Sequence, residues 1–191
     1  MDIYLIRHTT PAIASGICYG RSDIDLSASF KQELISLQSK LPNTTHAAIY
    51  SSPLRRCRLA AEALTTTSEN ALIIDQRLME LNFGAWEMLA WTQIPEPEMT
   101  QWSQNYVIQG PPQGESFQDL ATRAQDFFKQ LMSDCKHDCV LVLTHAGVIR
   151  AWLADVLHMP LALSFRLTLD YGGVTKVNIA QQHCRIDYIN R

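Results

Sequence analysis

The chain has little of what marks fibrous, disordered or membrane proteins. It contains 8 glycines and 8 prolines among 191 residues, with no internal repeat and no low-complexity segment, which excludes a collagen, a coiled coil and a disordered chain. No apolar run approaches the length of a membrane-spanning helix. Neither sign of charge dominates, since the net charge is −3 and the pI is about 6.0. We therefore expect neither nucleic acid nor a membrane as a partner.

Cysteine is also sparse and shows no pairing pattern. Five scattered cysteines are typical of free thiols in a reducing cytosol. Cys135, His137 and Cys139 lie close together, but they offer at most three ligands, whereas structural zinc normally takes four. Arg7 follows too soon after the N-terminus to leave room for the apolar segment of a signal peptide. These observations predict a cytoplasmic protein without a structural metal.

What the sequence does contain is an alternation of strand and helix patterns. Short apolar runs predict strands, and apolar residues at helical spacing predict the helices between them. The expected strands cover residues 2–7, 46–51, 72–75, 140–144, 174–180 and 184–188, and the expected helices 30–41, 53–66, 116–131 and 146–157. The last two strands are expected to be antiparallel edge strands. This order predicts a single α/β domain over residues 1–191, a three-layer sandwich with a mainly parallel central sheet flanked by helices.

Residues 80–114 interrupt the pattern. They contain three tryptophans and four prolines and read as an irregular excursion. We expect a small loop or helical cap over the carboxyl ends of the strands, where α/β sheets bind their ligands. For Trp91, packing within this cap is the favoured interpretation.

Polar residues with one shared chemical use stand at the expected strand ends and loop starts. These are Arg7-His8, Arg55-Arg56, Glu80 and His145. Each is a weak signal alone, because such residues are usually solvated or satisfied within the core. As a set, two arginines can bind phosphate oxygens, a neutral imidazole can attack phosphorus and a carboxylic acid can protonate the leaving alkoxide.

The same residues carry a resemblance to a known family. Residues 5–9 (LIRHT) resemble the Arg-His-Gly signature of the histidine phosphatase (phosphoglycerate-mutase-like) superfamily, and residues 51–57 (SSPLRRC) resemble its second arginine motif. Residues 78–87 (LMELNFGAWE) are similar to its acid loop, and residues 144–147 (THAG) to its second histidine motif. The order agrees throughout, and the resemblance covers about residues 1–180.

This resemblance implies a mechanism without a cofactor or metal. His8 would attack the phosphomonoester and become a phosphohistidine, which water then hydrolyses. Arg7, Arg56 and His145 would hold the phosphate oxygens, and Glu80 would act first as general acid and then as general base.

One position departs from the family pattern. The family usually has Gly-Glu after the catalytic histidine, whereas this chain has Thr9-Thr10. Two interpretations of Thr9 remain open: its hydroxyl donates to phosphate, or it is a plain loop residue.

The resemblance implies a small phosphomonoester as the substrate, and further motifs indicate which one. Residues 18–26 (CYGRSDIDL), 114–117 (GESF) and 171–175 (YGGVT) are similar to those of α-ribazole-5′-phosphate phosphatases, which act in cobalamin assembly. This implies substrate contacts from Tyr19, Gly20 and Arg21.

The alternatives are a phosphatase for another small sugar or organic phosphomonoester, a phosphoglycerate mutase, a phosphohistidine-protein phosphatase and a non-catalytic phosphate-binding protein. The chain is short for a mutase, it has the acid loop that phosphohistidine-protein phosphatases lack, and it keeps every catalytic residue that a binding protein would lose. The sequence does not distinguish a monomer from a dimer.

Overall fold

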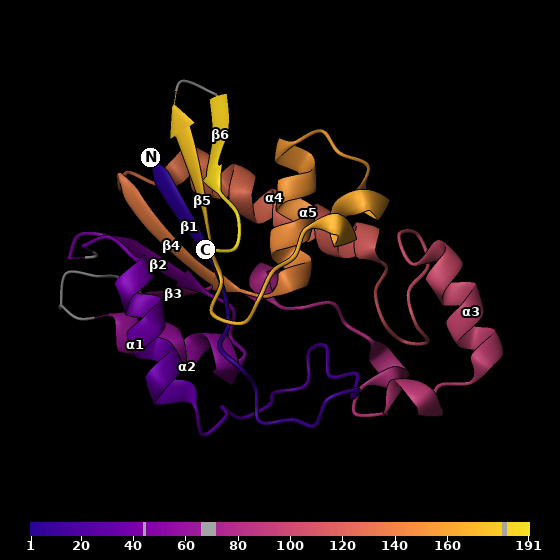
Figure 1. Cartoon of the computed structure of the whole chain (residues 1–191). Coiled ribbons are helices and arrows are strands. Elements are labelled where there is room, and N and C mark those ends of the chain that lie inside the picture. The colour runs from indigo at the N-terminus through magenta and orange to yellow at the C-terminus, as the bar shows by residue number, and fades with distance from the viewer. Residues whose placement is uncertain (44, 66–71, 181–182) are drawn as a thin grey trace.

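The computed structural model describes residues 1–43, 45–65, 72–180 and 183–191 and contains a six-stranded sheet (Figure 1). The strands lie in the order β3-β2-β4-β1-β5-β6. Their bounds are β1 Asp2–Arg7, β2 Ala48–Ser51, β3 Leu72–Ile74, β4 Cys139–Thr144, β5 Val174–Ala180 and β6 His183–Tyr188. The strands β3, β2, β4 and β1 are parallel, which confirms the expected mainly parallel sheet.

The two C-terminal strands are antiparallel, as expected, but only one of them is an edge. β5 pairs with β1 on one side and with β6 on the other. The prediction of two edge strands was therefore wrong for β5. The burial patterns agree with these positions in the sheet. Val174 and Val177 of the inner strand β5 are fully buried, whereas the edge strand β6 has no buried residue.

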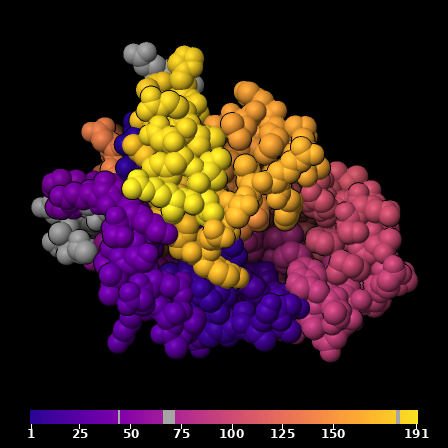
Figure 2. All heavy atoms as spheres, in the orientation of Figure 1, coloured from indigo at the N-terminus to yellow at the C-terminus, as the bar shows by residue number. Residues whose placement is uncertain are grey.

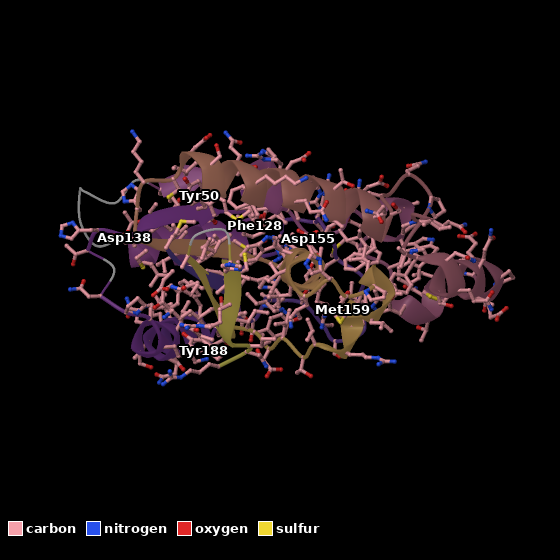
Figure 3. The ribbon with its side chains drawn as sticks, turned by 90° about the horizontal axis from the view of Figure 1, so that it is seen from above. Tyr50, Phe128, Asp138, Asp155, Met159 and Tyr188 are labelled. Atoms are coloured by element: carbon pink, nitrogen blue, oxygen red, sulfur yellow. The ribbon has the colours of Figure 1, made fainter. Side chains whose placement is uncertain are left out.

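Helices cover both faces of the sheet and make the expected three layers, which Figure 3 shows from above. The α-helices are α1 Phe30–Lys40, α2 Arg55–Leu64, α3 Glu96–Asn105, α4 Phe117–Asp134 and α5 Ala146–Val156, and short 3₁₀ turns cover Gln76–Leu78, Gly84–Trp86, Trp91–Gln93 and Leu161–Arg166. Within the described ranges, no helix combines the length and apolar composition needed to cross a membrane.

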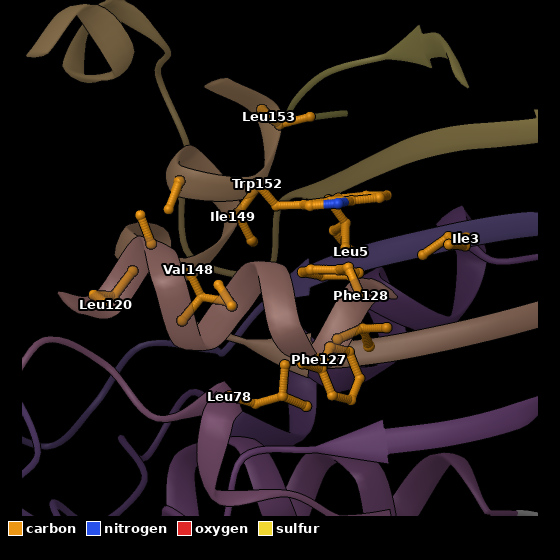
Figure 4. Packing of buried hydrophobic residues seen from close by; sticks show 14 of the residues in the cluster. Ile3, Leu5, Leu78, Leu120, Phe127, Phe128, Val148, Ile149, Trp152 and Leu153 are labelled. Atoms are coloured by element: carbon orange, nitrogen blue, oxygen red, sulfur yellow. The ribbon is translucent and has the colours of Figure 1, made fainter. Parts of the chain in front are cut away.

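Alternation along the central strands divides the core between the two faces. Ile3 and Leu5 of β1 pack with α4 and α5, whereas Tyr4 and Ile6 pack with α1 and α2. On the first face, the rings of Phe128 and Trp152 stack with their centroids 3.9 Å apart (Figure 4). This packing fixes α5, and therefore the loop between β4 and α5, against the sheet.

The segment 80–114 is less irregular than expected, because it contains α3, a helix of 10 residues. The segment packs on its own small cluster, in which Trp86 is buried and Phe83, Trp91 and Trp102 are partly buried. Trp91 contacts the ring of Phe83, as the cap-packing interpretation expected. In Figure 1 this segment stands beside the sheet, beyond α5.

Candidate active site

Three neighbouring parallel strands deliver the predicted residues to one edge of the sheet. β2, β4 and β1 lie side by side, and Arg7 is directly opposite Thr144 in the register. The residues that follow these two, His8 and His145, therefore meet, with ring centroids 5.1 Å apart. This is the edge at which ligands bind in open α/β sheets.

His8 is positioned as a neutral nucleophile. Its side chain is 2% exposed, and its Nδ1 lies 2.7 Å from the carbonyl oxygen of Thr9. Because a carbonyl oxygen only accepts, Nδ1 carries the proton and Nε2 keeps its lone pair. Burial, with the Arg56 and Arg7 guanidinium groups nearby, holds the pKa of His8 well below its usual range.

The two predicted phosphate-binding arginines are held by backbone carbonyls. Arg56 is fully buried and donates to the carbonyl oxygens of Ser22 (2.8 Å) and Gly20 (2.6 Å). Arg7 donates to the carbonyl of Leu169 and lies 3.9 Å from the ring centroid of Tyr171. Neither guanidinium has a carboxylate partner among the described residues, so both positive charges remain available to an anion.

Unpartnered polar atoms gather around His8. Five buried side-chain nitrogen or oxygen atoms lack a hydrogen-bond partner in the described part of the chain. Three of these are donors on the two residues that flank His8 and on Arg56, whose charge acts on His8: Nε of Arg7, Oγ1 of Thr9 and Nε of Arg56. A buried donor without a partner costs free energy, so such a group is typical of a site that an anion completes.

His145 is also buried, and two side chains from the β2–α2 region hold it. Its Nε2 lies 2.9 Å from Oγ of Ser52 and 3.5 Å from Sγ of Cys57. Burial holds the pKa of His145 well below its usual range, and Arg56 and His8 act in the same direction. Burial raises the pKa of the Cys57 thiol, so this sulfur stays protonated despite its position beside Arg56.

Glu80 is fixed against the start of α5. Its carboxylate accepts hydrogen bonds from the backbone N–H of Leu81 (2.9 Å) and of Gly147 (3.2 Å). A Cβ at position 147 would run into the Glu80 carboxylate, so a larger residue there would displace that side chain. The N-terminus of a helix favours negative charge, and this contact places the carboxylate at the start of α5, beside the residue that lies two positions after His145.

Two arginines outside the four catalytic motifs hold the backbone of Glu80. Its carbonyl oxygen accepts from Nε of Arg21 (3.1 Å) and from Nη2 of Arg123 (3.0 Å). Glu115 bridges the two arginines, with Oε1 at 2.9 Å from Arg21 and 2.7 Å from Arg123. The sequence offered a signal for Arg21, within residues 18–26, and for Glu115, within residues 114–117, but none for Arg123.

The three predicted substrate-contact residues have different surroundings. Tyr19 lies with its ring centroid 5.2 Å from Cζ of Arg56, and its hydroxyl is 3.0 Å from that of Tyr171. Gly20 supplies a carbonyl to Arg56, and both Tyr19 and Gly20 line a cavity beside the histidines. Arg21 is bound to Glu80 and Glu115 and does not line that cavity, so its contact with substrate stays a prediction.

The cavity has a volume of about 230 Å³, and five of its thirteen lining residues are aromatic. Figure 2 shows the face on which the N-terminal segment, the segment after α5 and the 80–114 segment meet. Its charged lining residues are Arg7, Glu80 and Arg150, and its aromatic ones are Tyr19, Phe83, Trp91, Phe117 and Phe165. Arg150 had no role in the sequence interpretation. A larger cavity of about 500 Å³ lies at the amino end of β4, around Ala47 and Cys139, away from these residues.

Metal ligands do not cluster in the described part of the chain. No three histidine, cysteine or carboxylate side chains in residues 1–43, 45–65, 72–180 and 183–191 are grouped so as to hold an ion. This includes Cys135, His137 and Cys139, and all five cysteines are free thiols.

Comparison with known proteins gives consistent matches over the whole length. The family model described as "Histidine phosphatase superfamily (branch 1)" matches residues 3–191. The adenosylcobalamin/alpha-ribazole phosphatase of Escherichia coli K12 is 24% identical over 194 residues, which cover 100% of this chain and 96% of that protein. The metal-independent phosphoserine phosphatase of Arabidopsis thaliana is 31% identical over 157 residues, 78% of this chain and 66% of that protein.

Among solved structures, the alpha-ribazole phosphatase of Shigella flexneri matches with a TM-score of 0.91. The identity is 23%, and the match covers 100% of this chain and 96% of the other. At this identity the likeness shows a common fold.

Proposed function

Because the chain belongs to the histidine phosphatase superfamily, and is accordingly a phosphatase, we propose that it hydrolyses small phosphomonoesters without a metal ion, through a phosphohistidine on His8. One observation carries this proposal. A neutral, buried His8 keeps a free Nε2, and three buried donors without a partner belong to its two sequence neighbours and to Arg56, whose charge acts on it. A phosphate group bound at this point would satisfy the donors and present its phosphorus to the nucleophile.

In the first step, Nε2 of His8 attacks phosphorus and the bond from phosphorus to the alcohol oxygen breaks. Arg7, Arg56, His145 and Thr9 hold the equatorial oxygens, over which negative charge is spread. The hydrogen bond from Nδ1 to the Thr9 carbonyl stabilises the positive charge that develops on the ring. Protonated Glu80 gives its proton to the leaving oxygen, and the alcohol departs.

In the second step, water attacks the phosphohistidine. Glu80, now a carboxylate beside the start of α5, accepts a proton from the water as the nitrogen–phosphorus bond breaks. Inorganic phosphate leaves, and His8 returns to its neutral form with Glu80 protonated.

Two classes of alcohol fit the cavity. α-Ribazole 5′-phosphate is the substrate expected from the sequence, and support comes from the E. coli relative's name and from the aromatic walls, which suit a flat base. The second class is a smaller organic phosphomonoester. The observation that favours it is the unpaired Arg150 in the wall of the cavity.

The test is phosphate release in the presence of EDTA from α-ribazole 5′-phosphate, 3-phosphoglycerate and a generic aryl phosphate. We expect turnover of at least one by the wild type and a loss on the order of 10⁴-fold in kcat for His8→Ala, because the nucleophile is removed. The matched control is His183→Ala, since His183 is exposed on the edge strand β6. Turnover that survives His8→Ala, or that EDTA abolishes, would contradict the proposal.

A further inference from the structure

Among the described residues, Arg150 forms no ion pair in the wall of the cavity, and the charge of Glu80 acts on it only from beyond ion-pair distance. Arg150 lies on α5, on the turn after Gly147, and lines the cavity together with Glu80 and Arg7. Its Nε donates to the carbonyl oxygen of Leu167 at 3.2 Å, and its Cζ is 5.0 Å from the ring centroid of Phe165. In the described residues, its two terminal nitrogens have no hydrogen bond and no carboxylate within ion-pair distance.

A partly buried arginine without a carboxylate partner is unusual among the described arginines. Arg21, Arg58, Arg77 and Arg123 are all partly buried, and each has a carboxylate partner. In the part of the chain that the structure describes, three buried or partly buried arginines have no carboxylate partner. These are Arg7, Arg56 and Arg150. Arg7 and Arg56 are assigned to the phosphate by the proposed function, so Arg150 is left as a third cation on the same cavity.

Glu80 does not neutralise Arg150 in the reacting complex. It is the one acidic side chain among the described residues that line the cavity, but its oxygens are bound by the N–H groups of Leu81 and Gly147. The proposed first step also requires Glu80 to be protonated, which removes its charge. A partly buried guanidinium in the wall of this cavity then has no anionic partner among the described residues unless the substrate brings one.

The geometry of the Arg150 guanidinium indicates which anionic group of a substrate it would bind. Two terminal N–H groups in a planar fork match the two oxygens of one carboxylate. A second phosphate dianion would need more positive charge than this wall offers, because the proposed phosphate site uses two arginines and a histidine for one such group. The cavity of about 230 Å³ also favours a small alcohol.

We propose that Arg150 binds a carboxylate on the alcohol part of the substrate, so that the preferred substrates are phosphomonoesters of small hydroxy acids. This rests on the proposed function, because it assigns the alcohol side of the same cavity. The alcohol part of α-ribazole 5′-phosphate has no carboxylate, so this assignment ranks it below the hydroxy-acid esters.

The test uses substrate pairs that differ at the carboxylate alone. O-phosphoserine is compared with O-phosphoethanolamine, and 3-phosphoglycerate with glycerol 3-phosphate. For the wild type we expect kcat/KM to favour the carboxylate member of each pair by on the order of 30-fold, mainly through KM, because a contact remote from phosphorus binds ground state and transition state alike. Arg150→Met brings both ratios close to one, and Arg150→Lys gives intermediate ratios because the charge stays but the fork is lost.

The ratio within each pair separates specificity from general damage, since any loss shared by both members cancels. Arg166→Met, on an exposed arginine of the neighbouring 3₁₀ turn, is the matched control and leaves the ratios unchanged. Ratios near one in the wild type, or ratios that survive Arg150→Met, overturn the assignment of Arg150. Turnover that survives His8→Ala overturns the proposed function instead, so the two failures are distinguishable.

Discussion

Thr9 is the residue at which this chain departs from its family, and the structure makes the departure testable. Its hydroxyl is fully buried and has no partner. If it donates to the substrate phosphate, Thr9→Val should lower kcat/KM by about 10- to 150-fold, because a hydrogen bond to a charged group is lost. The free energy of unfolding should stay the same or rise by about 1 kcal/mol, because the unpartnered hydroxyl is gone.

Thr175→Val is the control for this prediction. Thr175 is equally buried, but its hydroxyl accepts a hydrogen bond from the backbone N–H of Asn190 at 3.2 Å. Its removal should cost roughly 1 kcal/mol of stability and leave kcat/KM intact. Urea unfolding measures the stability of both variants, and steady-state kinetics measures their kcat/KM. Unchanged kinetics for Thr9→Val would make Thr9 a plain loop residue.

Among single residues, the sequence predicted the candidate catalytic residues better than the residues that hold them in place or line the cavity beside them. His8, Arg7, Arg56, His145 and Glu80 follow strands or lie in motifs, so their meeting at one edge could be expected from topology alone. Arg123 and Arg150 stand on helices at ordinary helical spacing, where an arginine is usually solvated. Only the fold decides that both face inward.

Among the elements, the acid loop depends on α4 for its position. Glu115, just before α4, bridges Arg21 and Arg123, and both arginines hold the carbonyl of Glu80. Glu115→Gln leaves two partly buried guanidinium groups without a counter-charge. We expect a loss of roughly 2–3 kcal/mol in the free energy of unfolding, and a fall in kcat larger than the rise in KM because Glu80 transfers the proton.

Glu62→Gln provides the comparison for urea unfolding. It removes the exposed pair between Arg58 and Glu62 on α2, which should cost no more than about 0.5 kcal/mol. Equal losses for the two variants, or an unchanged kcat for Glu115→Gln, would mean that the bridge does not position the acid loop.

Helix α3 shows why an element can be missed. None of its residues is buried, so no apolar periodicity marks it. Its prolines at positions 95 and 97 indicated an irregular segment, yet they stand at the start of the helix, where a missing N–H costs nothing. The helices that pack on the sheet were predicted because they do carry a buried stripe.

For the molecule as a whole, two buried neutral histidines make stability depend on pH. The pKa values of His8 and His145 are depressed in the folded state, whereas an unfolded chain binds protons near pH 6.5. The unfolded state therefore binds more protons as the pH falls below 6.5. Each histidine should then remove up to about 1.4 kcal/mol of stability per pH unit, and its contribution is fully present above pH 6.5.

Urea unfolding at intervals between pH 7.5 and 5.0 measures this slope. His8→Gln and His145→Gln should each reduce the slope by the contribution of one proton, and the double variant by two. A slope that is the same in all four proteins would show that neither histidine is kept neutral by the fold. Carboxylates contribute mainly below this window.

The four parallel strands of the sheet could be predicted because helices alternate with strands, and parallel strands need such crossovers. The position of β5 in the sheet could not be predicted, because its pairing with β1 joins residues about 170 positions apart in the sequence. Local patterns contain no information on which strand receives a C-terminal hairpin.

The central place of β1 has a consequence for the order of events during synthesis. β1 is made first, but both of its neighbours come late: β4 begins at Cys139 and β5 at Val174. At roughly 5–20 residues per second, the ribosome needs on the order of 10–30 s to supply them. During that interval the apolar strand that leads into His8 has no partner in the sheet, so the sheet around β1 is completed only after β4 and β5 have been synthesised.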